Sequence, residues 1–268
     1  MRIQGKVFIV TGGGSGIGRE VVLGLLMKGA RVAAVDLRAE ALEQTAALAG
    51  QVERLSLHPL DVTDRSGVEA MVEEVIAAHG QLDGLLNVAG TIQQFVPILD
   101  LSYEEIERVM NVNFWGVVNT TKAALPHLLE RPEAGIVNVS SMGGFTPVPG
   151  QSAYGASKAA VKLFTEGLYA EMRGTSVGVT VVFPGAIATE ISTNSGVSMG
   201  ERTKDQDSGA MPTTSAPDAA AAIIDGLEKG TYRILIGKDA RALDALSRMS
   251  PRRATEMIAK KMADLLGR

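Results

Sequence analysis

The sequence contains no cysteine and only three histidines. The absence of cysteine excludes disulfide bonds and thiolate chemistry, and it is compatible with a reducing compartment. His58, His79 and His127 are widely spaced along the chain, so a histidine-rich metal site is not expected. The predicted site therefore includes no metal.

Long apolar runs and an excess of basic residues are also missing. No stretch approaches the roughly 20 apolar residues that are needed to cross a bilayer. The first residues lack the apolar region and the cleavage site of a signal peptide. The net charge of −4 and the pI near 5.5 argue against a basic surface for nucleic acid. These absences predict a cytoplasmic protein without membrane insertion and without a nucleic-acid partner.

Short apolar strands alternate with amphipathic helices along the whole chain. The 268 residues are 46% hydrophobic, which is enough for one sizeable core. Strands that read as continuous apolar runs between helices indicate a parallel sheet covered on both faces. We therefore predict an α/β fold with a doubly wound parallel sheet of about seven strands, in a single domain of residues 1–268. The expected strands cover residues 7–10, 31–35, 51–60, 82–88, 135–139, 177–183 and 233–236.

Apolar residues at helical spacing fill the gaps between these strands. Pro126 marks a kink or a late break in the longest of these segments. Helices are expected from about Ile17 onward and over residues 39–48, 68–78, 103–129, 154–172 and 218–228.

Two segments differ in composition from this pattern. Residues 192–215 are polar and rich in Gly, Ser and Thr. They form either a disordered surface loop or a lid near residues 190–215, and the lid is favoured because ligands bind beyond the carboxyl ends of strands in open α/β sheets. Residues 239–268 alternate basic with apolar residues at helical spacing, which predicts a helical extension at the surface or at a subunit contact.

The stretch TGGGSGIG, residues 11–18, directly follows the first strand. It does not fit a nucleoside triphosphate loop, because Arg19 and Glu20 stand where a Lys and a hydroxyl are required. It does not fit G-x-G-x-x-G either, and its spacing is T-G-x-x-x-G-x-G. Glycines permit positive φ and close approach of a pyrophosphate, and the following helix offers free N–H groups and its positive dipole end. We interpret it as a dinucleotide loop.

Asp36 closes the second strand, 20 residues after Gly16 (36 − 16). A carboxylate at this place would accept hydrogen bonds from the adenosine ribose hydroxyls and would repel a 2′-phosphate, which favours NAD over NADP. Arg38 leaves NADP open, because a nearby Arg can accommodate that phosphate. Asp36 could instead cap the next helix.

The glycine-rich loop, Ser141 and the motif Tyr154-x-x-x-Lys158 together resemble the short-chain dehydrogenase/reductase family. Further family motifs follow in order between residues 6 and 236, although Val88 replaces the second Asn of N-N-A-G. The resemblance implies a Rossmann-like fold, an NAD(P) cofactor and a homodimer or homotetramer. The predicted cofactor-binding residues are Gly12, Gly14, Ser15, Gly16, Ile17, Gly18, Asp36, Leu37, Asp61, Val62, Asn87, Ala89, Gly90, Tyr154, Lys158, Pro184, Gly185, Ile187 and Thr189, and the predicted catalytic residues are Asn113, Ser141, Tyr154 and Lys158.

The chemistry of these residues suits proton transfer. Tyr154 and Lys158 are four residues apart, so a helix presents both on one face. A phenol with a pKa of ~10 is a poor acid–base catalyst at neutral pH, and a nearby Lys⁺ lowers that pKa. Ser141 could hold the substrate oxygen, and Asn113 could relay protons through water to Lys158. Ser141 could instead be a helix cap, and Asn113 an ordinary buried amide.

The sequence thus predicts an oxidoreductase that transfers a hydride between NAD(H) and a secondary alcohol or ketone, with Tyr154 as the general acid/base. Two alternatives stay open: an NADP-dependent reductase of 3-oxoacyl thioesters, and a dinucleotide-binding sensor or scaffold without catalysis. A small-molecule substrate is expected against residues 142–145 and 147–150, and against Gln93, Gln94 and Phe95. The sequence does not specify which substrate this is.

Overall fold

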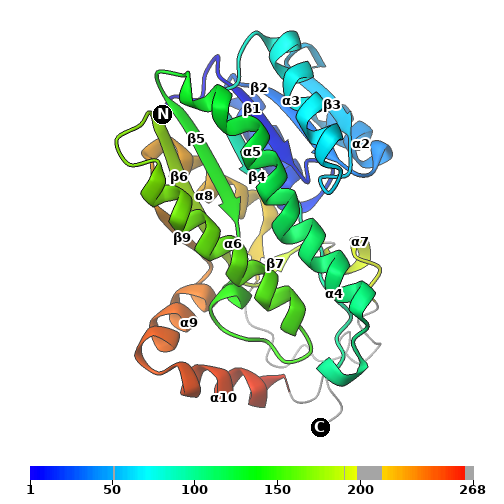
Figure 1. Ribbon diagram of the computed structural model, residues 1–268, viewed down its shortest axis with the longest axis vertical. Coiled ribbons are helices and arrows are strands. Elements are labelled where there is room, and N and C mark those ends of the chain that lie inside the picture. The colour runs from blue at the N-terminus through cyan, green and yellow to red at the C-terminus, as the bar shows by residue number, and fades with distance from the viewer. Residues whose placement is uncertain (51, 190, 198–212, 263–268) are drawn as a thin grey trace.

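The computed structural model describes residues 1–50, 52–189, 191–197 and 213–262. Seven parallel strands form one sheet in the order β3-β2-β1-β4-β5-β6-β9, with helices on both faces (Figure 1). The predicted doubly wound parallel α/β sheet is therefore confirmed. Its strands are β1 (Val7–Thr11), β2 (Arg31–Asp36), β3 (Leu55–Pro59), β4 (Gly84–Asn87), β5 (Ala134–Val139), β6 (Val177–Pro184) and β9 (Arg233–Ile236).

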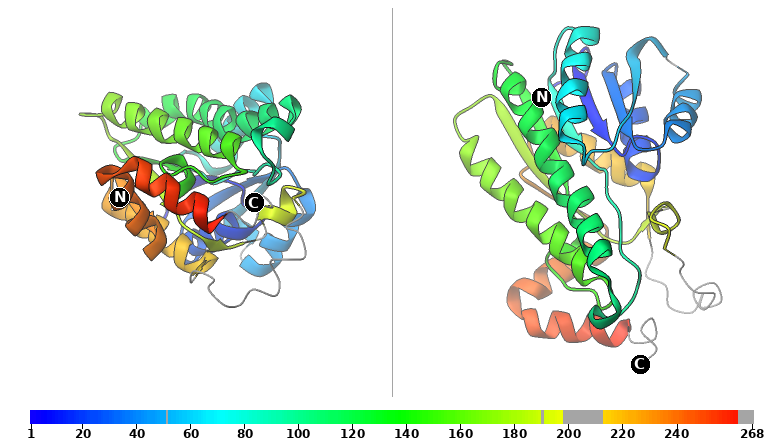
Figure 2. Two further views of the ribbon diagram at one scale, coloured as in Figure 1. Left: turned by 90° about the horizontal axis from the view of Figure 1, so that it is seen from below. Right: turned by 45° about the vertical axis from the view of Figure 1, so that its right-hand side comes forward.

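Two apolar cores lie on the two faces of the sheet, because successive strand residues point to opposite sides. In β1, Phe8 and Val10 belong to the core beneath α1 (Gly16–Met27), α2 (Ala39–Ala49) and α8 (Ala216–Lys229). Val7 and Ile9 belong to the other core. The helices over that second core are α3 (Arg65–His79), α5 (Gly116–Leu129) and α6 (Ser152–Glu171), and Figure 2 shows the two helical layers with the sheet between them.

The strand order changes direction between β1 and β4. The chain runs outward from β1 to β2 and β3, then returns to place β4 on the other side of β1. Thr11, the last residue of β1, pairs with Asn87 of β4 and with Val35 of β2. The carboxyl ends of β1 and β4 therefore flank a crevice, which is where open α/β sheets bind their ligands.

The helical region predicted over residues 103–129 contains an irregularity that periodicity did not predict. α4 (Tyr103–Met110) passes into a π-helical turn at Asn111–Trp115, and α5 follows directly. Pro126 lies inside α5, three residues before the helix ends, so the irregularity is not at the proline. π-helical turns insert an extra residue into the helical ladder and occur often at functional sites.

Among the predicted elements that differ from the structure, two show a physical reason for the difference. β3 begins at Leu55 rather than at residue 51. The pairing of β2 with β3 starts at Val32 and Leu55, and the preceding Val52–Arg54 forms a 3₁₀ turn. The extension predicted as one helix is two, α9 (Lys238–Met249) and α10 (Pro251–Lys261). Proline has no N–H to continue the α9 ladder, and it is favoured at the first position of a new helix. Residues 263–268 of the predicted extension lie outside the described residues.

Most of the lid predicted near residues 190–215 also lies outside the described residues, which leave out 190 and 198–212. Its described parts include α7 (Ile191–Asn194) and β8 (Thr214–Ser215). β8 pairs in parallel with β7 (Ile187–Ala188), which follows β6.

A buried carboxylate ties together the amino-terminal end of the sheet, away from the crevice. Asp83 is fully buried, and its Oδ2 accepts hydrogen bonds from Val7 N at 2.9 Å and Gln81 Nε2 at 2.6 Å. Its Oδ1 contacts Lys6 Nζ at 3.2 Å and Arg131 Nε at 3.0 Å. A charge this deep in the protein is tolerated only with such partners.

We expect Asp83→Ala to lower the free energy of unfolding by about 3–5 kcal/mol, because it leaves two partly buried cations without their partner. Urea denaturation at neutral pH measures this loss. The control is Asp225→Ala, which removes an exposed pair with Lys229 and should cost less than about 1 kcal/mol. Equal losses in the two variants would contradict the assignment.

Candidate active site

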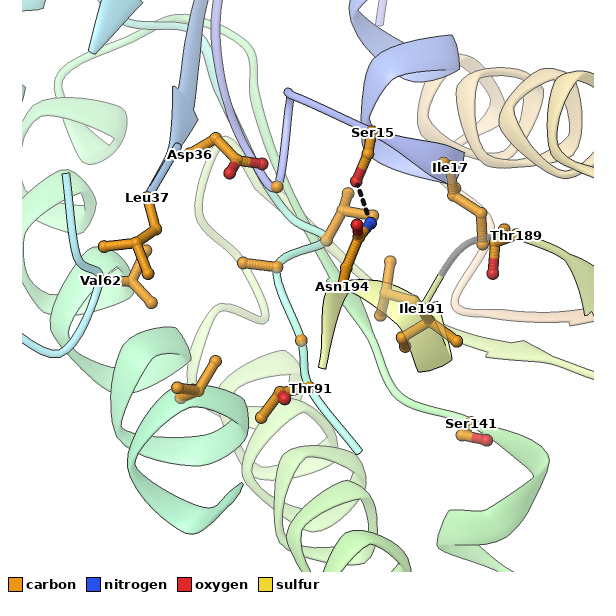
Figure 3. A pocket seen from close by; sticks show the side chains of 18 of the residues that line it. Ser15, Ile17, Asp36, Leu37, Val62, Thr91, Ser141, Thr189, Ile191 and Asn194 are labelled. Carbon is orange, nitrogen blue, oxygen red and sulfur yellow. Dashed lines mark hydrogen bonds between the residues drawn. The ribbon is translucent and has the colours of Figure 1, made fainter. Parts of the chain in front are cut away.

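A cavity of about 520 Å³ opens at the carboxyl ends of the strands. Figure 3 shows Asp36, Leu37 and Val62 at one end of it and Ser141 at the other. All but three of the predicted cofactor-binding and catalytic residues line this cavity, and the three exceptions are Gly14, Asn87 and Asn113. The residues that line it without having been predicted are Arg38, Leu60, Val88, Thr91, Arg108, Val112, Val139, Ser140, Ile191 and Asn194.

The glycine-rich loop is folded too tightly for side chains at two of its glycines. Gly12 has φ +71°, and a Cβ there would lie 2.9 Å from Ala89 Cα, beyond β4. A Cβ on Gly18 would overlap Gly12 O. Glycine at these positions lets the loop turn back on itself, with the start of α1 against Gly12 and Gly12 against Ala89.

Arg19 supports the same loop from outside, a role that the sequence analysis did not assign to it. Its guanidinium donates hydrogen bonds to Gly14 O and to Thr45 Oγ1. Thr45 in turn donates to Gly13 O at 2.9 Å. Arg19, which does not fit the sequence pattern of a nucleoside triphosphate loop, thus stabilises the backbone of the glycine-rich loop.

Asp36 at the end of β2 faces the loop and does not cap α2. Its Oδ2 accepts from Gly14 N at 3.0 Å, and its Oδ1 accepts from Arg38 N at 3.1 Å. The Arg38 Nε lies 3.8 Å from Asp36 Oδ1. The helix-cap alternative for Asp36 is therefore wrong, since Arg38 is the residue at the N-cap of α2.

Asn194 of α7 reaches across to the start of α1. Its Nδ2 donates to Ser15 Oγ at 3.1 Å, as Figure 3 shows, and its Oδ1 accepts from Arg38 at 2.9 Å. Arg38 Nη2 also lies 3.4 Å from Ser15 Oγ. These three side chains join α7, the glycine-rich loop and the end of β2 over one side of the cavity.

The three predicted residues at the end of β4 differ in position. Ala89 and Gly90 line the cavity, whereas Asn87 is buried behind it. Asn87 Nδ2 donates to Asn138 Oδ1 at 2.8 Å, and Asn87 Oδ1 accepts from Thr120 Oγ1 at 2.7 Å. Asn87 therefore holds β4, β5 and α5 together rather than lining the cavity.

Ser141 and Tyr154 meet at the inner end of the cavity. A Cβ on Gly143 would lie 3.5 Å from both Ser141 Oγ and Tyr154 Cε1, so the two side chains share one neighbour. Ser141 also accepts from Gly143 N at 3.1 Å, so the helix-cap alternative describes one of its contacts. Burial raises the pKa of the Tyr154 phenol, and its hydrogen bond with Ser141 opposes this change.

Lys158 lies on the same face of α6 with its ammonium group buried. Its Nζ donates to Val139 O at 3.0 Å, and burial lowers its pKa to about 8. The causes that shift the Tyr154 pKa are burial and Ser141, and Lys158 is not among them, so the lowering expected from Lys158 stays a prediction. Both pKa values move in the direction that desolvation favours, toward the neutral forms.

Asn113 lies behind the wall of the cavity, next to Lys158. A Cβ on Gly90 would lie 3.2 Å from Lys158 Nζ and 3.3 Å from Asn113 Oδ1. Asn113 Oδ1 accepts from Thr91 N at 2.8 Å, and its Nδ2 bonds Thr91 O and Ser157 Oγ at 2.9 Å each. It has the contacts of a buried amide, and the relay of protons to Lys158 stays a prediction.

The sequence profile of the short chain dehydrogenases matches residues 6–199. SadH of Mycobacterium tuberculosis is 39% identical over 269 residues, which covers 97% of this chain and 96% of SadH. The chain belongs to the short-chain dehydrogenase family. The 3-oxoacyl-(acyl-carrier-protein) reductase FabG of Thermotoga maritima is 36% identical over 193 residues, 72% of this chain and 78% of that protein. The chain is an oxidoreductase of this family.

Solved structures of the family share its fold. A short-chain dehydrogenase/reductase from Burkholderia phymatum in complex with NAD has a TM-score of 0.83 at 23% identity, covering 95% of this chain and 97% of that one. A short-chain dehydrogenase from Burkholderia cenocepacia in complex with NADP has a TM-score of 0.80 at 27% identity, covering 96% and 99%. No helix within the described residues is long and apolar enough to cross a membrane.

Two further residues of this short-chain dehydrogenase shape the site and were not found from the sequence. Arg108 of α4 lines the cavity and donates to Thr91 Oγ1 at 2.6 Å and to Ile92 O at 2.9 Å. Asp239 of α9 accepts from Ala186 N at 2.6 Å and so fixes the segment between β6 and β7. Both act over long sequence separations, so local motifs give no sign of them.

Lys158 is expected to make stability depend on pH above about pH 8. Its pKa is about 8 in the folded protein against an ordinary 10.5, so between these values the unfolded chain binds more protons. The free energy of unfolding should therefore rise with pH in this window, by up to about 3 kcal/mol from this group. Lys158→Met should abolish that part of the rise in denaturation curves recorded across the window. An identical rise in the variant would contradict the assignment.

Proposed function

We propose that this short-chain dehydrogenase transfers a hydride between NAD(H) and a secondary alcohol or ketone, with Tyr154 as the general acid/base. The observation that carries the proposal is the convergence of Ser141, Tyr154 and Lys158 on the cavity that the glycine-rich loop also lines. Tyr154 and Lys158 could also bind the dinucleotide in a sensor or scaffold, but such a protein needs no Ser141 hydroxyl beside the Tyr154 phenol, so the complete set argues against that alternative.

The cavity fits a dinucleotide along its length. The N-terminus of α1, with N-cap Ser15, opens onto it and suits a pyrophosphate. Asp36 at one end suits the adenosine ribose, with Asp61 and Val62 beside the adenine. At the other end, Ile187 and Thr189 suit the nicotinamide carboxamide. The bound dinucleotide would supply or accept the hydride, and no metal is part of the proposal.

The chain's own side chains then manage the substrate oxygen and its proton. Ser141 and Tyr154 present two hydroxyls at the same end of the cavity, where they would hold that oxygen. Tyr154 would donate its phenol proton as the carbonyl is reduced and accept it back in the oxidation. Lys158, buried four residues further along the same helix face, would stabilise negative charge on the Tyr154 oxygen when protonated.

Asp36 supports NAD as the preferred cofactor. Its carboxylate is held toward the loop by Gly14 N, at the place where a 2′-phosphate would lie. Arg38 does not offer a free guanidinium for that phosphate, since it contacts Asn194, Ser15 and Asp36. The NADP-dependent reduction of 3-oxoacyl thioesters is the second candidate, favoured by the similarity to FabG of Thermotoga maritima.

We also propose a cellular location, a substrate class and an oligomeric state for the enzyme. We place it in the cytoplasm as a single domain, acting on a small molecule, and as a homodimer or homotetramer. Two exposed apolar side chains support self-association. Trp115, just before α5, is 52% exposed, and Leu163, on α6, is 69% exposed.

Tyr154→Phe should lower kcat by about 100-fold or more, because it removes the proton that the mechanism requires. Cofactor affinity should change little. NADH formation against a panel of secondary alcohols, sugars, steroids and hydroxyacyl thioesters first identifies a substrate, and steady-state kinetics then give the loss. Tyr169→Phe on the same helix is the matched control and should keep its turnover. Unaltered turnover in Tyr154→Phe would overturn the mechanism.

Asp36→Ala should lower the ratio of kcat/KM with NADH to that with NADPH by about tenfold or more, because it removes the charge that repels a 2′-phosphate and releases Arg38. Asp61→Ala is the control, and it should weaken both cofactors without reversing the preference. Equal use of NADH and NADPH by the unaltered enzyme would contradict the reading of Asp36.

A further inference from the structure

Gln93, in the loop that follows β4, is fully buried and bonds the start of α6. Its Oε1 accepts hydrogen bonds from Ala153 N at 2.8 Å and from Tyr154 N at 3.0 Å. Its Nε2 donates to Gly150 O at 2.9 Å. Gln93 was predicted to line the substrate pocket. This prediction is wrong, because its side chain is fully buried and hydrogen-bonded to backbone groups.

The first turn of α6 has no side-chain cap from its own N-cap residue. That residue, Gln151, instead donates its Nε2 to Gln93 O at 2.8 Å. Gln93 is thus bonded to this region through its backbone carbonyl as well as through its side chain, and its amide oxygen accepts from the N–H groups that a local cap would serve. A residue 61 positions away therefore fixes the N–H of Tyr154 itself.

The loop that carries Gln93 is held firmly from the side of α4. Thr91 bonds Asn113 through both its N–H and its carbonyl. Glu105 Oε1 accepts from Gln94 N at 2.8 Å, and Arg108 donates to Ile92 O. With its neighbours fixed on both sides, Gln93 transmits the position of α4 and of the π-helical turn to the start of α6.

We propose that Gln93 is a positioning residue for the acid/base chemistry, because its amide oxygen fixes the backbone from which the Tyr154 phenol extends toward Ser141. The proposal rests on the proposed function of Tyr154. From the other side, a Cβ on Gly155 would lie 3.1 Å from Gly143 O, so the turn after Ser141 packs against the same part of α6. Small shifts of a reacting group cost large factors in rate.

The direct readout is the ionisation of Tyr154, which requires no substrate. The chain has four tyrosines, so ¹³Cζ-tyrosine NMR resolves them individually, and Tyr154→Phe assigns the signal of interest. In Gln93→Met the pKa of Tyr154 should rise by about half a unit or more, because the hydrogen bond with Ser141 that lowers it is weakened. With the substrate that the panel of alcohols, sugars, steroids and thioesters identifies, kcat should fall about tenfold or more. The KM for NADH should change by no more than about twofold in either direction.

Three further variants separate positioning from stability. Thr175→Ala removes bonds to Met172 O and Val177 N just beyond the far end of α6, and it should change neither kcat nor the pKa of Tyr154. Gln93→Glu keeps acceptors for both α6 N–H groups but loses the donor to Gly150 O, so it should retain more kcat than Gln93→Met without matching the unaltered enzyme. Gln93→Asn is one methylene shorter and cannot reach all its partners, so it repeats the test if Gln93→Met does not fold.

Two failures have different meanings. If Gln93→Met, or Gln93→Asn in its place, keeps the kcat and the Tyr154 pKa of the unaltered enzyme while Tyr154→Phe is inactive, the positioning proposal is overturned and the proposed function stands. If Tyr154→Phe turns over normally, the proposed function fails and the positioning proposal fails with it.

Discussion

The pairing of β1 with β4 is the constraint on which the rest of the site depends. It places Thr11 opposite Asn87, and the Thr11 hydroxyl accepts hydrogen bonds from Val88 N and Ala89 N. The glycine-rich loop can then pass so close to the end of β4 that Ala89 leaves no room for a Cβ on Gly12. The crevice exists because two chain segments leave these neighbouring strands in different directions.

The helix that carries Tyr154 and Lys158 is placed against this frame by buried polar groups. Asn138 of β5 accepts from Asn87 and donates to Thr165 in the middle of α6. Ser140 Oγ donates to Lys158 O at 2.7 Å. These bonds are fully buried, and a buried polar group without a partner costs more than an apolar one, so alternative placements of α6 are disfavoured. Gln93 adds the last fixed point, at the end of the helix nearest the cavity.

The parts of the site that could be predicted are those whose signal is local. Tyr154 and Lys158 lie one helical turn apart, and Asp36 closes a strand of clear apolar pattern, so local motifs and the family resemblance that they carry locate them. The roles of Arg19, Asp239 and Gln93 could not be predicted, because each is defined by a backbone partner that only the fold brings near, in the case of Gln93 at a separation of 61 residues. The π-helical turn could not be predicted either, because an apolar spacing near 3.6 residues per turn does not reveal one inserted residue.

Burial by itself does not make Tyr154 a catalyst. It raises the pKa of the phenol and lowers the pKa of Lys158 to about 8, and both changes favour neutral groups. Among the described protein groups, the hydrogen bond of Ser141 is what opposes the rise at Tyr154. Such a bond depends steeply on distance and angle, so its contribution is only as large as the placement of the phenol allows. In the proposed mechanism the placement of the phenol therefore matters more than net charge, and the bonds at the first turn of α6 hold the backbone from which the phenol extends.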